Sequence, residues 1–255
     1  MSKASYFGMR FHQGLGFSRL LMKIPPAEAI FWPGCALLNL DGAILERTLD
    51  VLRRAEPEIR LACGCYGQPT VYLFPAKVRS RKEKLVSLLK KQGVRRIYTA
   101  CPNCTLQLRQ LEGFEIIPIW GVLAEHLRPE DTVSPEGKFV WHDPCPTRSD
   151  PAQQEAARIL LQTCGCDCCQ PACTGCRTKC CGNFHMMAAT DPEKSRKMRL
   201  ARLADFPENT IIASSCEGCL GAFRSEGRST RHLLELLFGA SCSRGWGNRF
   251  KTTWK

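Results

Sequence analysis

The stretch TACPNC, residues 99–104, has a second copy in SSCEGC, residues 214–219, and the distance between the copies decides the fold. The first cysteines of the two stretches, Cys101 and Cys216, lie 115 residues apart, and their last cysteines lie the same distance apart. Self-similarity at a fixed spacing indicates repeated structural units. The chain is therefore expected to be a tandem duplication.

A second pair of stretches follows the same shift. KCCGNFHM, residues 179–186, contains two adjacent cysteines before a glycine, and the shift carries Cys180 onto Cys65. Tyr66 then stands opposite Cys181. Adjacent cysteines do not readily bond to each other, because a disulfide needs a particular separation of its Cα and Cβ atoms. Both sulfurs of the pair are thus expected to face another group.

The first cysteines of the two halves set the lobe boundaries. Cys35 corresponds to Cys145 at a shift of 110 residues, so the second half has gained five residues before its CCG stretch. The joint between the halves is expected near residues 131–137. The predicted organisation is a basic N-terminal arm at 1–28, a first lobe at 29–130, a second lobe at 137–240 and a basic C-terminal tail at 241–255.

Short β-rich runs alternate with helical patterns in both halves. Strands are expected at residues 29–34, 58–63, 95–101, 114–119, 138–143 and 209–216. Helices are expected at residues 43–55, 81–92, 120–128, 151–162, 192–205 and 229–238. This order predicts an α/β fold, a tandem duplication of two small lobes with mostly parallel sheets and helices on the faces. The cysteines then follow the carboxyl ends of strands, where α/β proteins place their sites.

Composition and cysteine usage narrow the class of protein. The chain has 255 residues and 44% hydrophobic content, enough to fill cores without disulfide scaffolding. No signal peptide and no membrane-spanning stretch are expected. Close cysteine spacing in a reducing compartment points to metal or catalysis. The odd total of 17 cysteines also leaves at least one outside any complete pairing.

The net charge of +12 comes largely from the two ends of the chain. Residues 1–23 carry four basic residues and no acid, and residues 241–255 do the same. Basic ends on a nearly balanced body suggest arms that dock on an acidic partner or an anionic surface. Solvated tails that only aid solubility are the alternative. Two glycines within residues 9–23 weaken a helix there.

The cysteine spacing of the second half resembles that of the cysteine-rich CCG domain family. Between Cys145 and Cys180 lie 34 residues, 34 more separate Cys181 from Cys216, and a CxxC ends at Cys219. The family includes the cysteine-rich subunit of heterodisulfide reductase and iron–sulfur subunits of glycolate, lactate and glycerol-3-phosphate oxidising systems. The resemblance covers roughly residues 29–239. The lead-in also looks like the family's usual one, with His142, Asp143 and Pro144 before the first cysteine and Arg148 after it.

The resemblance implies that five thiolates hold a non-cubane 4Fe-4S cluster in the second lobe. The implied ligands are Cys145, Cys180, Cys181, Cys216 and Cys219. Independently of the family, thiolate-rich sites select soft metals, with iron–sulfur and zinc the leading choices. Five thiolates exceed the four that tetrahedral zinc needs, which favours iron–sulfur.

The first lobe departs from the family pattern, because Tyr66 replaces the second adjacent cysteine. Four ligands suffice for an ordinary cubane cluster, and Cys63 is a candidate for a displaced fifth ligand. The alternative is a degenerate lobe kept as a scaffold. The four matching cysteines are Cys35, Cys65, Cys101 and Cys104.

An insert at residues 164–176 adds six cysteines just before the CCG stretch. They are candidates for a further cluster, a zinc site or a redox-active dithiol, and any of them is a candidate to replace an assigned ligand. His185, in the stretch GNFHM, is a candidate ligand or proton donor. The six cysteines are Cys164, Cys166, Cys168, Cys169, Cys173 and Cys176.

Other polar residues are open to structural interpretations. Asp143 either relays protons or shapes a turn, and His126 and His232 are expected on amphipathic helices in structural roles. The sequence has no Walker-type phosphate loop, dinucleotide fingerprint or serine-elbow motif, which argues against a nucleotide or flavin bound by the chain itself. No catalytic residue is assigned.

Two classes of function stay open at this stage. The first is the iron–sulfur subunit of a heterodisulfide-reductase-like complex, which receives electrons from a flavoprotein or a ferredoxin-like subunit and serves electron transfer or disulfide reduction. The second is a zinc-stabilised module that binds an acidic partner or nucleic acid, although nucleic acid is the less favoured partner. A cytoplasmic location is expected, with peripheral association at the cytoplasmic face of the membrane as a further expectation.

Overall fold

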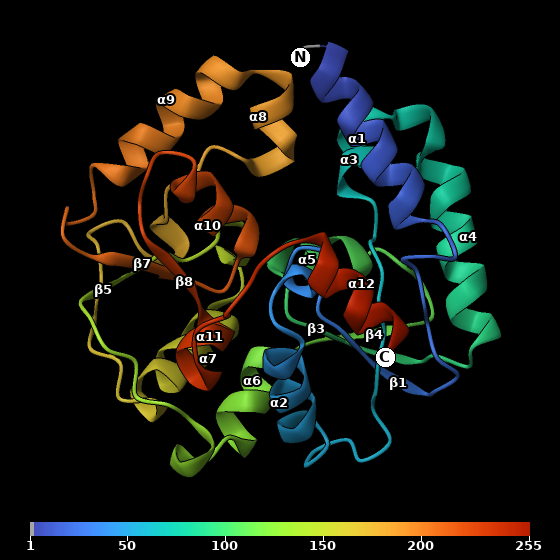
Figure 1. Ribbon diagram of the computed structural model, residues 1–255, viewed down its shortest axis with the longest axis horizontal. Coiled ribbons are helices and arrows are strands. Elements are labelled where there is room, and N and C mark those ends of the chain that lie inside the picture. Colours follow the sequence, from blue (N-terminus) through green and yellow to red (C-terminus); the bar gives the residue numbers. More distant parts are fainter. Residues whose placement is uncertain (1–2) are drawn as a thin grey trace. The chain divides into compact units, whose positions relative to one another are not determined.

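The computed structural model describes residues 3–255, and the side chains of all of these except residues 3–6 and 69. The chain forms two compact units (Figure 1). The first comprises Met1–Pro118 together with Cys242–Lys255, and the second comprises Ile119–Ser241. Each unit is built around one parallel sheet of four strands.

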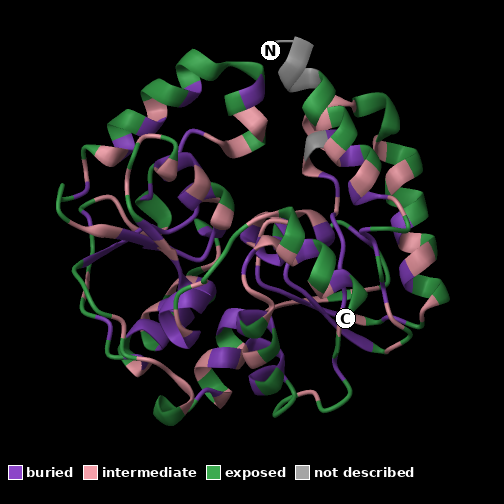
Figure 2. Ribbon diagram, viewed as in Figure 1, coloured by how far each residue is buried: buried purple, intermediate pink, exposed green. Residues whose placement is uncertain are grey.

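The sheet of the first unit has the strand order β2-β1-β3-β4, and every neighbouring pair is parallel. Its central strand β1 reads AIFW and is buried along its whole length, as expected for a parallel sheet covered on both faces (Figure 2). The strands are β1 (Ala29–Trp32), β2 (Arg60–Leu61), β3 (Arg96–Thr99) and β4 (Glu115–Pro118).

Helices surround this sheet and complete the core of the first unit. Ile30 and Trp32 of β1 share one buried cluster with Leu85 and Leu89, which lie on one face of α4. Asp41 accepts a hydrogen bond from the Ala43 amide and so caps α2. The helices are α1 (Lys3–Gly16), α2 (Gly42–Leu52), α3 (Gln68–Leu73), α4 (Val78–Lys91), α5 (Pro102–Leu108) and α12 (Trp246–Trp254).

The sheet of the second unit repeats this topology, with the order β6-β5-β7-β8 and parallel pairs throughout. The two sheets and the helices that cover them confirm the predicted α/β fold class and its duplication. The strands are β5 (Phe139–Trp141), β6 (Cys168–Cys169), β7 (Ile211–Ser214) and β8 (Thr230–His232).

The helices of the second unit begin with strong start signals. Asp150 and Asp191 cap α7 and α9, and a proline follows each of them at the first helical position. The helices are α6 (Ile119–His126), α7 (Pro151–Thr163), α8 (Met187–Thr190), α9 (Pro192–Leu203), α10 (Glu217–Arg224) and α11 (Leu233–Phe238).

One predicted helix is wrong over its first residues. A helix is expected throughout residues 229–238, but Thr230–His232 form β8, paired in parallel with β7. His232 therefore ends a strand, and its ring nitrogen caps α11 by accepting a hydrogen bond from the Leu234 amide at 3.2 Å. Strand pairing outweighs the local helical pattern here.

The two chain ends fold onto the first unit as helices. The α1 helix forms despite Gly14, and α12 lies close to α2. The Trp254 indole donates a hydrogen bond to the Leu20 carbonyl at 3.1 Å, and the rings of His12 and Trp246 meet edge to face at 5.3 Å. The ends of the chain are thus parts of one packed unit, and their docking on a partner stays a prediction.

Candidate metal centre

Three of the five thiols assigned to the second unit follow the carboxyl ends of its strands. Cys145 opens a single 3-10 turn after β5, and Cys216 is the N-cap residue of α10, which carries Cys219 in its first turn. Cys180 and Cys181 follow the insert and enter the same buried region as α10. We call these residues the second-lobe thiol cluster: Cys145, Cys180, Cys181, Cys216 and Cys219.

The cluster is continuous through its side chains. The Cys180 thiol is hydrogen-bonded to those of both Cys145 and Cys181. The Cys219 thiol is hydrogen-bonded to those of Cys181 and Cys216. The structure therefore brings together all five cysteines that the sequence assigns to this lobe.

Charge is unevenly shared among these thiols. Hydrogen bonds donated by the Cys145 and Cys181 thiols lower the pKa of Cys180 to about 2, and the amides of Phe184 and Gly182 add to the effect. The Gly182 amide lies 3.3 Å from the Cys180 sulfur. The pKa of Cys145 is raised, first because its thiol donates to Cys180 and then by burial. Cys180 is thus the thiolate around which its neighbours gather.

The glycine of the CCG stretch is a steric requirement. Gly182 has φ +84°, and a Cβ built on it would lie 2.2 Å from the backbone oxygen of Ser195. The Ser195 hydroxyl also donates to the Gly182 carbonyl at 2.7 Å. The turn that presents two adjacent thiols is therefore fixed against α9 at a distance that only glycine permits.

Asp143 organises the end of the insert, just before the CCG stretch. Burial acts to raise the pKa of its carboxyl, but hydrogen bonds from Arg158, Thr174, the Gly175 amide and Trp141 outweigh burial and lower it to about 2. The Gly175 amide donates at 2.8 Å and the Trp141 indole at 2.7 Å. With every one of these partners in place, Asp143 acts as a structural anchor.

His142 is a buried and uncharged residue of the same region. Burial lowers the pKa of its ring to about 3, and the positive charge of Arg202 adds to this. Its Nδ1 accepts a hydrogen bond from the Arg202 side chain at 3.3 Å, and its ring meets that of Phe223 edge to face at 5.0 Å. The imidazole near Cys180 is therefore uncharged and packs against the Phe223 ring.

His185 stands on a strained turn directly after the CCG stretch. His185 and Met186 have φ 56° and 59°, the positive values that side chains other than glycine rarely adopt. The His185 ring stacks on Phe184, with ring centroids 3.9 Å apart. The candidate role of His185 as a ligand or proton donor stays a prediction.

Four thiols of the first unit gather in the equivalent place. Cys35 and Cys65 are hydrogen-bonded to each other, and so are Cys101 and Cys104. Gly34 lets the pairs approach, because a Cβ built on it would lie 2.9 Å from the Cys104 sulfur. We call this group the first-lobe thiol cluster: Cys35, Cys65, Cys101 and Cys104.

Cys65 is an acidic thiol of the first-lobe cluster. A hydrogen bond from Cys35 lowers its pKa to about 7 against the opposing effect of burial, and the Gly67 amide donates to its sulfur at 3.3 Å. The side chain of Gln13, from α1, also contributes a hydrogen bond, and the charge of Arg249, from α12, acts in the same direction. Both chain ends therefore contribute side chains to this site.

Tyr66 faces the four thiols of the first lobe. Burial raises the pKa of its hydroxyl well above the ordinary value, and negative charge on each of the four cluster sulfurs raises it further. The phenol that replaces the second cysteine of the CCG pattern thus remains a neighbour of the cluster.

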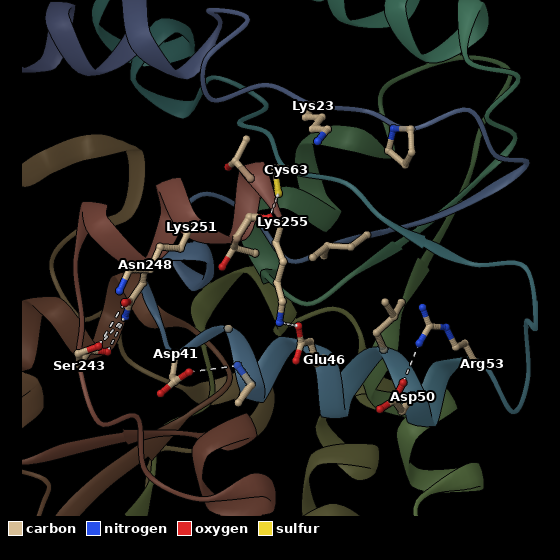
Figure 3. Close-up of a pocket in the computed structure, with 17 residues that line it drawn as sticks. Lys23, Asp41, Glu46, Asp50, Arg53, Cys63, Ser243, Asn248, Lys251 and Lys255 are labelled. Atoms are coloured by element: carbon tan, nitrogen blue, oxygen red, sulfur yellow. Dashed lines mark hydrogen bonds and ion pairs between the residues drawn. The ribbon is translucent and has the colours of Figure 1, made fainter.

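Cys63 contacts α12 rather than the four thiols of the first-lobe cluster. Its thiol donates to the Thr252 carbonyl at 3.9 Å, and it lines a pocket of ≈ 860 Å³ together with residues of α2 and α12 (Figure 3). A Cβ on Gly64 would lie 2.4 Å from the Trp32 ring, so this glycine lets the chain cross the ring between the two cysteines. The contacts of Cys63 do not join it to the first-lobe cluster, and its role as a fifth ligand stays a prediction.

The insert forms a separate set of thiols. Cys168 and Cys169 make up the edge strand β6, the counterpart of β2, and the Cys166 thiol is hydrogen-bonded to that of Cys168. Burial raises the pKa of the neighbouring Cys164 to about 11. Cys173 is half-buried and Cys176 is exposed. A metal role for the insert stays a prediction.

The second-lobe thiol cluster suits an iron–sulfur group better than a zinc ion. Among the described residues, no three His, Cys, Asp or Glu side chains are already arranged to hold a metal ion. The thiols instead contact one another, and none of the 17 cysteines forms a disulfide. Five converging thiols exceed the needs of one zinc ion and are the ligand type of iron–sulfur clusters. The second-lobe cluster therefore fits such a group in chemistry and in number.

Two neighbours of the first-lobe cluster escaped the sequence analysis. Gln13 and Arg249 lie in the chain ends, where the clearest feature of the sequence is its net charge. One signal was available, since both ends repeat aromatic residues at helical spacing among the polar ones.

Along the described part of the chain, the structure contains no helix that is both long enough and apolar enough to cross a membrane.

Comparison with known proteins gives one clear match. A model of the CCG cysteine-rich domain family matches residues 29–109 and again residues 139–224. No curated protein matches the chain.

Similarity to solved structures is weak. An aspartate racemase of Picrophilus torridus is 9% identical over 88% of this chain and 98% of its own, with a TM-score of 0.35. An aspartate racemase homologue of Pyrococcus horikoshii is 12% identical over 89% and 100%, with a TM-score of 0.32. An allantoin racemase of Klebsiella pneumoniae is 16% identical over 87% and 92%, with a TM-score of 0.29. Scores this low carry no argument about function.

Proposed function

Because the chain belongs to the CCG cysteine-rich domain family and contains two copies of that domain, we propose that it is an iron–sulfur subunit of a redox complex similar to heterodisulfide reductase. The family resemblance inferred from the cysteine spacing is thereby confirmed. The subfamily, the complex and the cluster type belong to the proposal.

The observation that carries this proposal is the convergence of five thiols in the second lobe. Cys145, Cys180, Cys181, Cys216 and Cys219 would hold a 4Fe-4S cluster of the non-cubane type, and the first-lobe thiols would hold a second cluster. Iron–sulfur clusters of this kind accept and release single electrons. The chain's own contribution is to gather the ligands and to shield them with His142, Phe206 and Phe223.

Particular residues set the position of the ligands. Gly182 holds the turn that presents Cys180 and Cys181, and its amide donates to the Cys180 sulfur. Asp143 anchors the loop before this turn through Gly175 and Thr174. In this proposal a disulfide reduced at the second lobe would take up two electrons and two protons to give two thiols.

The electrons must come from another subunit, because the sequence offers no nucleotide or flavin motif of its own. We therefore propose a flavoprotein or ferredoxin-like partner, in a reducing compartment such as the cytoplasm. The absence of disulfides among the described cysteines supports that environment.

Metal analysis of anaerobically purified protein tests the proposal. We expect about eight iron atoms per chain, with matching sulfide, for two four-iron clusters, and low-temperature EPR signals from two centres. Cys181→Ser should alter or remove the second-lobe signal and leave the first-lobe signal intact. Cys242→Ser, which changes an exposed cysteine outside both thiol clusters, is the matched control.

Two results would count against the proposal in different ways. Unchanged iron content and spectra in Cys181→Ser would remove the non-cubane assignment. Zinc without iron in the wild-type protein would remove the redox function and favour a zinc-stabilised binding module.

A further inference from the structure

The C-terminal helix α12 carries a buried cation in the first unit. Arg249 is only 1% exposed, and within the described chain its Nε and Nη2 atoms have no hydrogen-bond partner. No acidic side chain of the described residues forms an ion pair with it. Its guanidinium lies over the ring of Trp246, 5.1 Å from the centroid, which offsets part of its lost hydration. A buried charge without a counter-charge is strongly destabilising, so an anion is expected nearby.

The first-lobe thiols are the candidates for that anion. A Cβ built on Gly16 would lie 3.6 Å from the Cys65 Cβ and 4.0 Å from Arg249 Nη2, so the guanidinium and Cys65 flank the same point. The charge of Arg249 acts on Cys35 as well as on Cys65. Arg249 therefore faces the cluster from the side that α1 and α12 cover.

The four first-lobe cysteines would supply the missing negative charge if they bind a metal group as thiolates. A metal group held by four thiolates keeps a net negative charge, and adding an electron makes that charge larger. In a buried site a nearby cation stabilises the more negative state more than the less negative one. The position of Arg249 would thus favour both assembly of the centre and its reduction.

We propose that Arg249 is the built-in counter-cation of a metal–thiolate centre at Cys35, Cys65, Cys101 and Cys104, and that α12 closes this centre on its buried side. This inference rests on the proposed metal centre of the first lobe and adds the residue that tunes it. Arg249 acts through charge, so it is a positioning and tuning residue rather than a ligand.

Charge-matched variants of the full chain test the role of Arg249. Arg249→Met removes the charge and keeps most of the aliphatic volume, whereas Arg249→Lys keeps the charge. Lys251→Met removes an exposed charge from the same helix and is the control. The first-lobe signal is identified as the one that Cys101→Ser removes. Each variant is titrated with dithionite and followed by EPR, and release of its metal to a chelator is timed.

We expect Arg249→Met to lower the reduced-to-oxidised ratio of the first-lobe centre about tenfold at a fixed potential, which is about 59 mV for a one-electron couple. Metal release should become several-fold faster. Arg249→Lys should stay near wild type, and Lys251→Met should match it. Loss of the first-lobe centre in Arg249→Met but not in Arg249→Lys would support the same role.

Two outcomes would overturn the inference. The first is an equal shift in Arg249→Met and Lys251→Met, which would mean that only the overall charge of the unit matters. The second is loss of the centre in both Arg249 variants, which would mean that packing matters rather than charge. If the protein contains zinc and no iron, the redox function fails, but faster zinc release in Arg249→Met alone would still support the counter-cation.

Discussion

The two lobes place their thiols alike and surround them differently. In both, cysteines follow the carboxyl ends of parallel strands, and a CxxC pair starts the helix after the third strand of the unit, α5 or α10. The second-lobe cluster has a fifth thiol and a neutral His142 beside it. The first-lobe cluster has Tyr66, Gln13 and Arg249 instead. The duplication thus kept the ligand positions while the neighbours diverged.

The arginines near the two clusters illustrate this divergence. Arg202 in the second unit is fully buried but paired, with its Nη1 3.0 Å from the Asp205 carboxylate. Arg249 in the first unit is equally buried, and no described carboxylate neutralises it. The two proposed centres are therefore expected to differ in redox potential.

Gly182→Ala should be the most damaging of these changes. The added Cβ would meet the Ser195 backbone oxygen at 2.2 Å, and φ +84° is unfavourable for alanine. A clash with backbone cannot be relieved by a rotamer change, so we expect a loss in the free energy of unfolding above about 4 kcal/mol. Metal content of the second lobe should fall with it. Chemical denaturation and iron analysis measure the two effects.

Gly113→Ala is the matched control for Gly182→Ala. Gly113 has the same φ of +84°, yet nothing lies within 4 Å of a Cβ built there. Alanine should cost only the left-handed backbone penalty, about 1 kcal/mol. Equal losses in the two variants would show that φ alone matters and that the contact with α9 does not.

Asp143 should make the second unit sensitive to acid in a way that the first is not. Its folded-state pKa of about 2 lies below the ordinary 3.8, so its stabilising contribution is complete above pH 4 and is lost as the pH falls through about 2. The shift corresponds to about 2 kcal/mol. The first lobe has Pro33 and Gly34 before its cysteine and no such carboxylate.

Unfolding curves between pH 5 and pH 2 check the role of Asp143. Asp143→Asn removes the titrating group, and its stability should fall less steeply over this window than that of the wild type. Asp167→Asn, at an exposed position of the insert, should leave the slope unchanged. An Asp143→Asn curve parallel to the wild-type curve would contradict the assignment.

Much of the fold could be predicted from the sequence, because apolar runs such as those of β1, β3 and β7 end in cysteines at repeated distances. The exceptions have physical causes. The edge strand β6 consists of Cys168 and Cys169, whose sequence pattern indicates metal ligands or a redox-active dithiol rather than a strand. The polar strand β8 is too short for its alternation to be recognised ahead of the apolar run of α11, and only pairing with β7 defines it.

The cysteines of each thiol cluster could also be predicted from the sequence, because their repeated spacing indicates which of them belong together. Their neighbours were not. Gln13 and Arg249 come from opposite ends of the chain, so no local pattern connects them with Cys65. Only the packing of α1 and α12 in the first unit brings these residues to the thiols. Contacts between residues that lie far apart in the sequence follow from the packing of the folded chain and not from a local sequence pattern.

Tyr66 occupies the position where the second lobe has Cys181, so a change of this residue tests how far the two lobes differ because of one side chain. Tyr66→Phe removes only the hydroxyl that faces the four thiols, so we expect a change in the first-lobe EPR signal with little change in the free energy of unfolding. Tyr72→Phe, which removes a half-buried hydroxyl from α3 of the same unit, should leave that signal unchanged. If Tyr66→Phe left the signal unchanged, the hydroxyl would be a bystander, and the divergence of the two lobes would rest on the missing fifth thiol and on Arg249.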